Sequence, residues 1–331
     1  MRICSPIKIS IWILGVISAC TAPPVEEGQD SHYPFQLPQL KNIKVDGEFS
    51  EWQEISAVLL TATETGRVEP ETFEGLFKLA WKPDGLAFYA KVQDDFLKEE
   101  KAPLLQNDGL ELFISQKQGS PQMMQYIISP GISQAYPEAR IEKVDYGKGQ
   151  SFTDLQDMQL LAEPLEQGYQ LEGFIPFASL GFSPSKGDTL ALNFYINDAD
   201  QEGRAVRHNW HYFPSTYNNR QAQYLLILAA QESMPRLTAR VYLEDTSTYR
   251  FSVFGERALA GKKVRLQSGA ETLLEKLFEI KGNNAYAEFS LNKRVVSTAS
   301  SLDLWLDGNF DQPIDPSLVP LSYVNLPQPH R

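Results

Sequence analysis

The sequence predicts an all-β protein made of two successive β-sandwich domains. Its 331 residues exceed the roughly 250–300 residues at which one hydrophobic core stops growing, so two domains are expected. Apolar and polar residues alternate in short runs such as residues 86–92, 110–114 and 190–196, which is the period of half-buried strands. The 21 Pro and 21 Gly residues punctuate the chain, and apolar repeats of helical period are almost absent. Helices should therefore contribute little.

The N-terminal residues have the features of a secretory signal peptide. A charged start precedes an apolar run at residues 9–17, which is about half the length that spans a bilayer. The run ends in residues 17–20, ISAC, which resemble a bacterial lipobox, where the Cys is acylated and becomes the first mature residue. We therefore expect residues 1–19 to be a lipoprotein signal peptide and Cys20 to carry a lipid. An ordinary cleaved signal is the alternative, but it leaves Cys20 unpaired because Cys4 lies inside the signal.

The segment that follows is expected to be a tether. Residues 20–40 are polar, rich in Pro and without periodicity. The protein should thus be lipid-anchored at a bacterial outer membrane or cell surface. The formal charge is 30 − 42 = −12. Without the two basic residues of the signal peptide it becomes 28 − 42 = −14. This charge excludes electrostatic binding of nucleic acid, which needs a clustered basic face.

Turn signals divide the remaining chain into two domains. The first is expected over residues 41–231, because the apolar run at residues 224–230 is followed by a linker-like break at residues 231–235. The second, residues 236–325, has five to seven short strand patterns that suit a small immunoglobulin-like sandwich. Other small β folds fit this pattern too, and the role of the domain is unknown. Residues 270–280 are the best helical candidate, although they also fit a strand.

Four segments of the first domain resemble the family 9 carbohydrate-binding modules and occur in the same order as in that family. They are a strand with an Asp-Gly turn and a Trp, a hairpin followed by two Asp residues, an Asp-x-x-Glu-x-Phe strand, and a Gly-Tyr strand that leads to an Asn-Asp turn. The segments occupy residues 43–52, 77–95, 107–114 and 168–200. The resemblance covers residues 43–229 or so and does not extend to the second domain.

The resemblance implies a sandwich that binds a poly- or oligosaccharide without cleaving it. Members of the family hold a sugar between aromatic side chains while polar groups bind its hydroxyls, and some bind Ca²⁺ structurally. Such a site needs a flat aromatic ring for the C–H face of the sugar and polar groups for its rim. Burial of one ring face, on the order of 100 Å² at about 25 cal/mol per Å², contributes roughly 2–3 kcal/mol before ordering costs.

Five residues are predicted to bind carbohydrate, and the first of them is Trp210. It follows the Asp-rich turn, where the family places a binding aromatic, although a core Trp of a late strand is the alternative. Arg207 and Asn209 are its polar neighbours, but on a strand they face away from Trp210, so only a loop brings the three together. Trp81, beside a hairpin turn, either projects as a second platform or seals the core. Arg140 lies in the stretch where the family supplies a site Arg.

The sequence predicts no cofactor firmly, and a structural Ca²⁺ is the candidate that its acidic turn offers. Asp198 and Asp200 lie in an acidic turn that offers the oxygen ligands that Ca²⁺ prefers. The full Asp-x-Asp-x-Asp-Gly loop with its distal Glu is missing, so a solvated turn is the alternative. His208 and His211 do not predict a zinc pair, because a strand would direct them to opposite faces and no third ligand is apparent.

Three other functions remain open. In a carbohydrate-active enzyme or enzyme subunit, Asp108 and Glu111 would not be the catalytic pair, because they face opposite sides of a strand. In a haem-binding electron-transfer domain, Met123 and Met124 are the only adjacent Met pair for axial ligation. In a surface protein complex, the second domain would supply the partner face.

Overall fold

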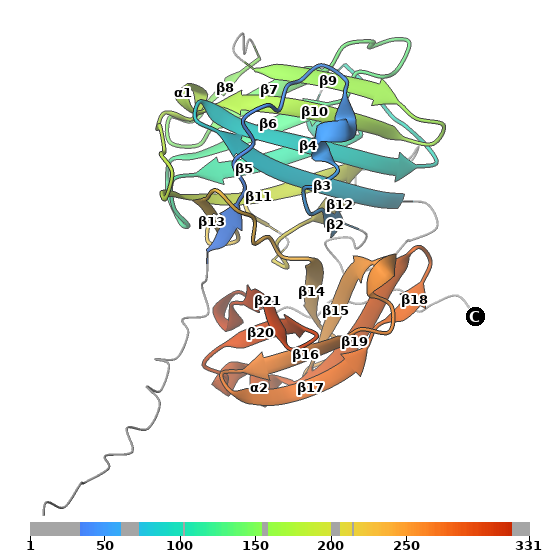
Figure 1. Cartoon of the computed structure of the whole chain (residues 1–331), viewed down its shortest axis with the longest axis vertical. Coiled ribbons are helices and arrows are strands. Elements are labelled where there is room, and N and C mark those ends of the chain that lie inside the picture. The colour runs from blue at the N-terminus through green and yellow to red at the C-terminus, as the bar shows by residue number, and fades with distance from the viewer. Residues whose placement is uncertain are drawn as a thin grey trace, which may run out of the picture.

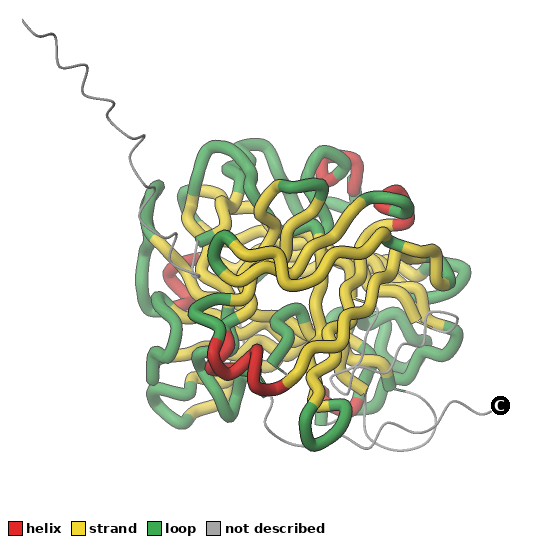
Figure 2. Tube along the Cα trace, turned by 90° about the horizontal axis from the view of Figure 1, so that it is seen from below, coloured by secondary structure: helices red, strands yellow, loops and turns green. Residues whose placement is uncertain are grey.

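The computed structural model describes residues 34–60, 73–101, 103–153, 158–199, 206–213 and 215–319. Over these residues the chain is almost entirely β and forms a larger domain above a smaller one, as drawn in Figure 1. Figure 2 shows how few helical segments there are among the strands. The predicted all-β class is therefore confirmed. The predicted signal peptide, Cys20 and the first part of the tether lie outside the described residues.

The first domain is a sandwich of an eight-stranded and a five-stranded sheet. The eight-stranded sheet has the order β1-β13-β11-β5-β6-β7-β8, and β12 also pairs with β11. Its strands are β1 Phe35–Leu37, β5 Gly109–Ser115, β6 Met123–Ser129, β7 Arg140–Asp145, β8 Gln150–Phe152, β11 Thr189–Asp198, β12 Val206–Asn209 and β13 Tyr224–Leu228. The other sheet has the order β2-β3-β4-β10-β9, with β2 Val58–Leu60, β3 Phe73–Lys82, β4 Gly85–Asp94, β9 Gln159–Pro164 and β10 Tyr169–Pro176.

The main core fills the space between these two sheets. On β5, Leu110, Leu112 and Ile114 point into it, as the alternation of the sequence predicts. Aromatic rings from both sheets meet there, for example Phe77 of β3 and Phe194 of β11 with ring centroids 3.6 Å apart. The intervening side chains of β5 lie on the outer face of the eight-stranded sheet, which the rest of the molecule partly covers.

Strand β1 corrects the predicted end of the tether. Residues 35–37 pair in parallel with β13 at the edge of the larger sheet. Phe35 and Leu37 are 4% and 0% exposed, because this short alternating run places both side chains in the main core. The tether predicted to extend to residue 40 is therefore wrong over its last residues.

The second domain is a smaller sandwich of two four-stranded sheets, in the orders β14-β15-β19-β18 and β17-β16-β20-β21. Its strands are β14 Leu237–Leu243, β15 Thr248–Glu256, β16 Lys263–Ser268, β17 Glu271–Leu277, β18 Glu279–Lys281, β19 Asn284–Asn292, β20 Leu302–Leu306 and β21 Asn309–Ile314. The helical reading of residues 270–280 is wrong, since this stretch forms the edge strands β17 and β18. The immunoglobulin-like assignment stays a prediction.

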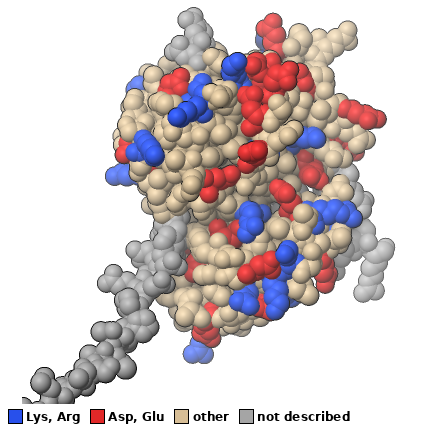
Figure 3. Space-filling model, in the orientation of Figure 1, with Lys and Arg blue, Asp and Glu red and all other residues tan. Residues whose placement is uncertain are grey.

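Among the described residues, helices are limited to one or two turns. They are α1 Phe177–Leu180, α2 Lys293–Thr298 and the 3₁₀ helices Phe49–Trp52, Leu104–Gln106, Arg257–Leu259 and Pro316–Leu318. Within the described part of the chain, no helix has the length and apolarity needed to cross a bilayer. On the face shown in Figure 3, both domains carry acidic and basic side chains, and acidic ones gather in the upper part of the larger domain.

Candidate functional site

Trp210, the predicted principal platform, lies in the main core. It is 0% exposed, and its ring centroid lies 4.6 Å from that of Tyr224 and 5.4 Å from that of Phe194. Strand β12 directs Arg207 and Asn209 to the outer face, so the indole that follows them faces inward. The prediction that Trp210 is an accessible platform is therefore wrong, and its alternative, a core Trp, is confirmed.

Trp81, the predicted second platform, is also buried. It is 2% exposed at the end of β3, and its Nε1 donates a hydrogen bond to the carbonyl oxygen of Ala229 at 2.8 Å. This bond satisfies the indole N–H inside the protein and leaves no ring face open to a ligand. The platform role predicted for Trp81 is wrong, because the indole seals the core.

A polar network crosses the outer face of the eight-stranded sheet. Arg207 Nε of β12 lies 3.3 Å from Glu111 Oε1 of β5. The other oxygen, Glu111 Oε2, accepts a hydrogen bond from Gln125 Nε2 of β6 at 2.5 Å. Tyr146, just after β7, donates its hydroxyl hydrogen to Gln125 Oε1 at 2.7 Å. Strands β12, β5 and β6 and the residue after β7 thus contribute a guanidinium, a carboxylate, an amide and a phenol to one chain of contacts.

Two side chains extend this network to the surface. Tyr217 is 38% exposed, and its ring centroid lies 5.6 Å from the guanidinium carbon of Arg207. The guanidinium carbon of Arg220 lies 5.5 Å from the ring centroid of Tyr146. Both distances are within the range of a cation–π contact. We call this set the Glu111–Arg207 site, which consists of Glu111, Gln125, Tyr146, Arg207, Tyr217 and Arg220.

Burial determines the charge state of the site. Glu111 and Arg207 are 1% and 7% exposed, so each charge needs the other as a partner away from water. The pKa of the Tyr146 phenol is raised by burial and by the Glu111 carboxylate, while Arg220 and Arg207 oppose the shift. Tyr146 is therefore a neutral hydrogen-bond donor near pH 7. The site combines an exposed aromatic ring with groups that can bind vicinal hydroxyls.

The other two predicted residues do not join this site. Asn209 is 0% exposed, and its Nδ2 donates to the carbonyl oxygens of His211 at 2.7 Å and Phe213 at 2.9 Å. Arg140 lies on β7, four strand positions from Arg207 on β12, or about 19 Å at the usual strand spacing. The loop that was required to bring Trp210, Arg207 and Asn209 together is not formed, because Arg207 and Asn209 lie on strand β12, and Arg140 lies apart from them.

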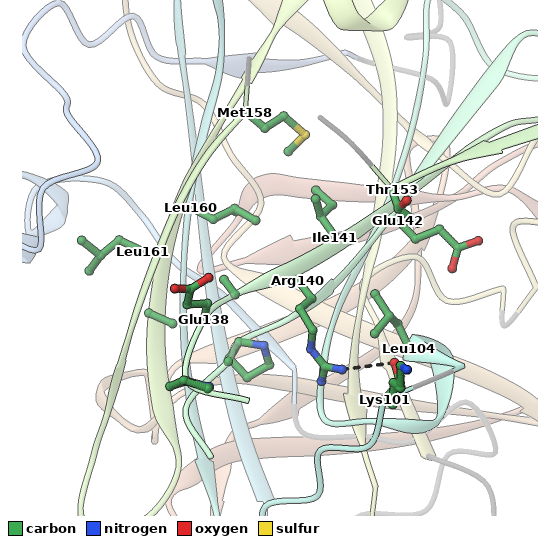
Figure 4. Close-up of a pocket in the computed structure, with 15 residues that line it drawn as sticks. Lys101, Leu104, Glu138, Arg140, Ile141, Glu142, Thr153, Met158, Leu160 and Leu161 are labelled. Atoms are coloured by element: carbon green, nitrogen blue, oxygen red, sulfur yellow. Dashed lines mark hydrogen bonds between the residues drawn. The ribbon is translucent and has the colours of Figure 1, made fainter. Parts of the chain in front are cut away.

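Arg140 instead lines a cavity of about 760 Å³ beside strands β7 and β9 (Figure 4). Its guanidinium donates to the carbonyl oxygens of Glu100 at 2.7 Å and Lys101 at 3.2 Å, and it stacks on Tyr136. Much of the wall is aliphatic, with Leu104, Ile141, Met158, Leu160, Leu161 and Ala162. Among the described residues that line the cavity there is no aromatic ring, so it lacks the platform that a sugar face needs.

Asp198, predicted as a metal ligand, belongs to a buried group of three carboxylates. Ligand oxygens of Asp94, Asp108 and Asp198 all lie within 4.8 Å of one another. Asp108 accepts hydrogen bonds from the backbone N–H groups of Lys98 and Ala199. Burial, with Asp94 and Asp198 nearby, raises the pKa of Asp108 to about 8. Asp200, the second predicted ligand, lies outside the described residues.

The donor set of this group fits Ca²⁺. Carboxylate oxygens are the ligands that the ion prefers, and a divalent cation would offset the repulsion among three buried carboxylates. Tyr169 is fully buried nearby, and its hydroxyl has no hydrogen-bond partner among the described residues. Burial and the carboxylates of Asp108 and Asp94 raise its pKa well above the usual value. A bound Ca²⁺ would join the ends of β4, β5 and β11 through Asp94, Asp108 and Asp198.

The geometry also bears on the haem and enzyme alternatives. Met123 packs with Phe113 and Tyr195 on the outer face, whereas Met124 points into the main core. The two sulfurs therefore cannot ligate one haem together. Asp108 belongs to the three-carboxylate group, whereas Glu111 forms the ion pair with Arg207. Their predicted separation on opposite faces of the strand is confirmed.

The first domain is thus a β-sandwich with a polar network on the outer face of its larger sheet. The chain belongs to the carbohydrate family 9 binding domain-like family, whose model matches residues 45–224. No curated protein matches the sequence significantly.

Two similar solved structures are family 9 carbohydrate-binding modules from Caldicellulosiruptor kristjanssonii. The one in complex with cellotriose is 18% identical, with coverage of 60% of this chain and 94% of that chain and a TM-score of 0.43. The one in complex with glucose is 19% identical, with coverage of 60% and 97% and a TM-score of 0.42.

Sequence reasoning missed most of the Glu111–Arg207 site. Glu111 had a usable signal, because the apolar residues on either side of it point into the core and leave it on the outer face. Its alignment with Arg207 depends on the register of β12 against β11 and β5, which no local pattern encodes. Tyr217 lies between strands in irregular structure, where periodicity predicts nothing.

Proposed function

We propose that this protein captures a saccharide at the Glu111–Arg207 site without cleaving it. The observation that carries the proposal is the exposed Tyr217 ring beside the Arg207 guanidinium, at the end of a continuous polar network. The ring offers a surface for the C–H face of a sugar. The neighbouring carboxylate, guanidinium and amide groups are suited to its hydroxyls.

A binding role without catalysis is supported by the number of carboxylates. Glycoside hydrolysis by the usual route needs two carboxyl groups that flank the scissile bond. Within the described residues, the Glu111–Arg207 site contains only one, and Glu111 is already held by Arg207 and Gln125. This ion pair leaves no second carboxyl group in the site to act as acid or nucleophile.

The site should bind weakly and rely on tethering. One exposed aromatic ring contributes roughly 2–3 kcal/mol before ordering costs. A lipid on Cys20 would hold many copies at a bacterial outer membrane or cell surface, where multivalent contact compensates for weak single sites. Anchoring is thus part of the proposed function.

Affinity electrophoresis of the purified protein through gels that contain single neutral polysaccharides tests the binding proposal. The panel should include a β-glucan, with glucose and cellotriose as soluble competitors. Retardation by at least one polysaccharide, with no release of reducing ends, is expected. Unchanged mobility with every polysaccharide would contradict binding. Release of reducing ends in proportion to the protein concentration would favour the enzyme alternative.

The anchor is tested separately by expressing the full chain in a bacterial host. Metabolic labelling with a fatty acid should mark the wild type and not a Cys20→Ala variant, which should leave the membrane fraction. Equal labelling of both chains, or membrane retention of Cys20→Ala, would contradict the lipid anchor.

A further inference from the structure

The segment that leads to Tyr217 is partly built into the second domain. Tyr212 follows the last first-domain residues of the buried Trp210 region, yet its ring belongs to the hydrophobic core of the second domain. Its hydroxyl donates to the carbonyl oxygen of Asp315 at 2.9 Å. Phe213 packs against the same core. Residues 212 and 213 therefore couple the two domains through apolar burial.

A buried arginine of the second domain holds the same segment by its backbone. Arg240 of β14 is 1% exposed. Its Nη1 donates to the carbonyl oxygens of Trp210 at 3.2 Å and His211 at 3.5 Å. A buried guanidinium is costly unless its donors are used, so these carbonyl groups and the charge stabilise each other.

The far end of the segment is fixed to the outer face of the first domain. Thr216 donates its backbone N–H to the Tyr195 hydroxyl at 2.7 Å, and its Oγ1 accepts from Asn193 Nδ2 at 2.7 Å. Tyr217, the next residue, lies beside Arg207. Tyr217 is five positions after Tyr212, which is at most about 18 Å of extended chain. The contacts of Tyr212 with the second domain and of Thr216 with the first domain therefore lie close together along the chain.

We propose that the second domain is a positioning element for the saccharide site. Through Arg240 and Tyr212 it fixes the start of the segment at residues 210–217, and so the placement of the Tyr217 ring over Arg207. This inference rests on the proposed function and assigns a role to the second domain. Arg240 and Tyr212 are positioning residues, since neither belongs to the Glu111–Arg207 site.

Two variants of the full chain test this role. Arg240→Met keeps much of the side-chain volume but removes the donors to the Trp210 and His211 carbonyl groups. Tyr212→Phe removes only the bond to Asp315. The matched control is Tyr249→Phe, the same change at another buried tyrosine of the second-domain core. Thermal unfolding identifies variants that fail to fold.

The readouts are saccharide affinity by calorimetry and amide hydrogen exchange at Thr216. Arg240→Met should raise the Kd by about fivefold or more and speed amide exchange at Thr216. Tyr212→Phe should change both quantities in the same direction. Tyr249→Phe should leave both unchanged. Unchanged affinity and exchange in both folded variants would overturn the proposal. If the wild type binds no saccharide, the proposed function fails, and faster exchange at Thr216 still decides whether the second domain positions the segment.

Discussion

Arg207 and Trp210 lie three residues apart and end in opposite environments. Arg207 faces outward to Glu111, whereas Trp210 is packed among aromatic rings of the main core. The alternation of a strand predicts this separation. The position of Trp210 after the Asp-rich turn, where the resemblance implies a binding aromatic, favoured it as the platform, but a large indole contributes most when it is buried. The exposed ring beside Arg207 is that of Tyr217.

Glu111→Gln tests the polar half of the site. The substitution keeps the size of the side chain but removes the charge that pairs with Arg207, so saccharide affinity should fall by about tenfold or more, as for a charged hydrogen bond worth about 1.5–3 kcal/mol. Isothermal titration calorimetry measures the change. Glu142→Gln, at the Arg140 cavity, is the control. If Glu142→Gln loses affinity and Glu111→Gln does not, the saccharide binds in the Arg140 cavity and not at the Glu111–Arg207 site.

A second residue-scale prediction concerns Asp311 at the junction of the two domains. Its carboxylate accepts the backbone N–H groups of Arg236 and Leu237, and burial raises its pKa from 3.8 to about 6. The folded state therefore retains a proton that the unfolded state releases, and the stability from this group is lost as pH rises from about 4 to about 6. The change amounts to at most about 3 kcal/mol.

Urea unfolding of the wild type and of Asp311→Asn across that pH range measures this effect. The difference in unfolding free energy between the two should fall as pH rises, because the Asn side chain does not titrate. Parallel stability curves would show that Asp311 has an ordinary pKa in the folded protein.

At the scale of elements, the strand pattern was predictable and the strand partners were not. Alternation located β4, β5 and β11 because each has a buried inner face. The pairing of β1 with β13 joins residues about 190 positions apart, and only tertiary packing specifies it. The same holds for the three-carboxylate group, whose members come from the ends of three separate strands.

Calcium should stabilise the first domain through these strand ends. A ligand that binds only the folded state adds about 2.7 kcal/mol at one hundred times its Kd, so Ca²⁺ should raise the thermal midpoint and a chelator should reverse the rise. Asp108→Asn should abolish the response, whereas Asp95→Asn, an exposed neighbour, should retain it. An equal response in Asp108→Asn would exclude this group as the Ca²⁺ site.

At the scale of the whole molecule, several contacts join the two sandwiches, and those of Tyr212 and Arg240 lie at the segment that leads to the site. Length, turn residues and alternation predicted two β domains, and the order of four motifs identified the family of the first. The inward-facing tryptophans, the register that pairs Arg207 with Glu111 and the insertion of Tyr212 into the second domain all arise from contacts distant in sequence. Local patterns carry no information on such contacts.

Tyr217 is the saccharide platform that we propose for this molecule. This role is tested by calorimetric titration of an oligosaccharide of a polysaccharide that retards the protein into the wild type, Tyr217→Ala and Phe152→Ala. Phe152 is the control, because it is 40% exposed against 38% for Tyr217 and lies outside the Glu111–Arg207 site. Loss of a ring contact worth about 2 kcal/mol should weaken binding about thirtyfold in Tyr217→Ala and leave Phe152→Ala unchanged. Wild-type affinity in a folded Tyr217→Ala protein would contradict the account.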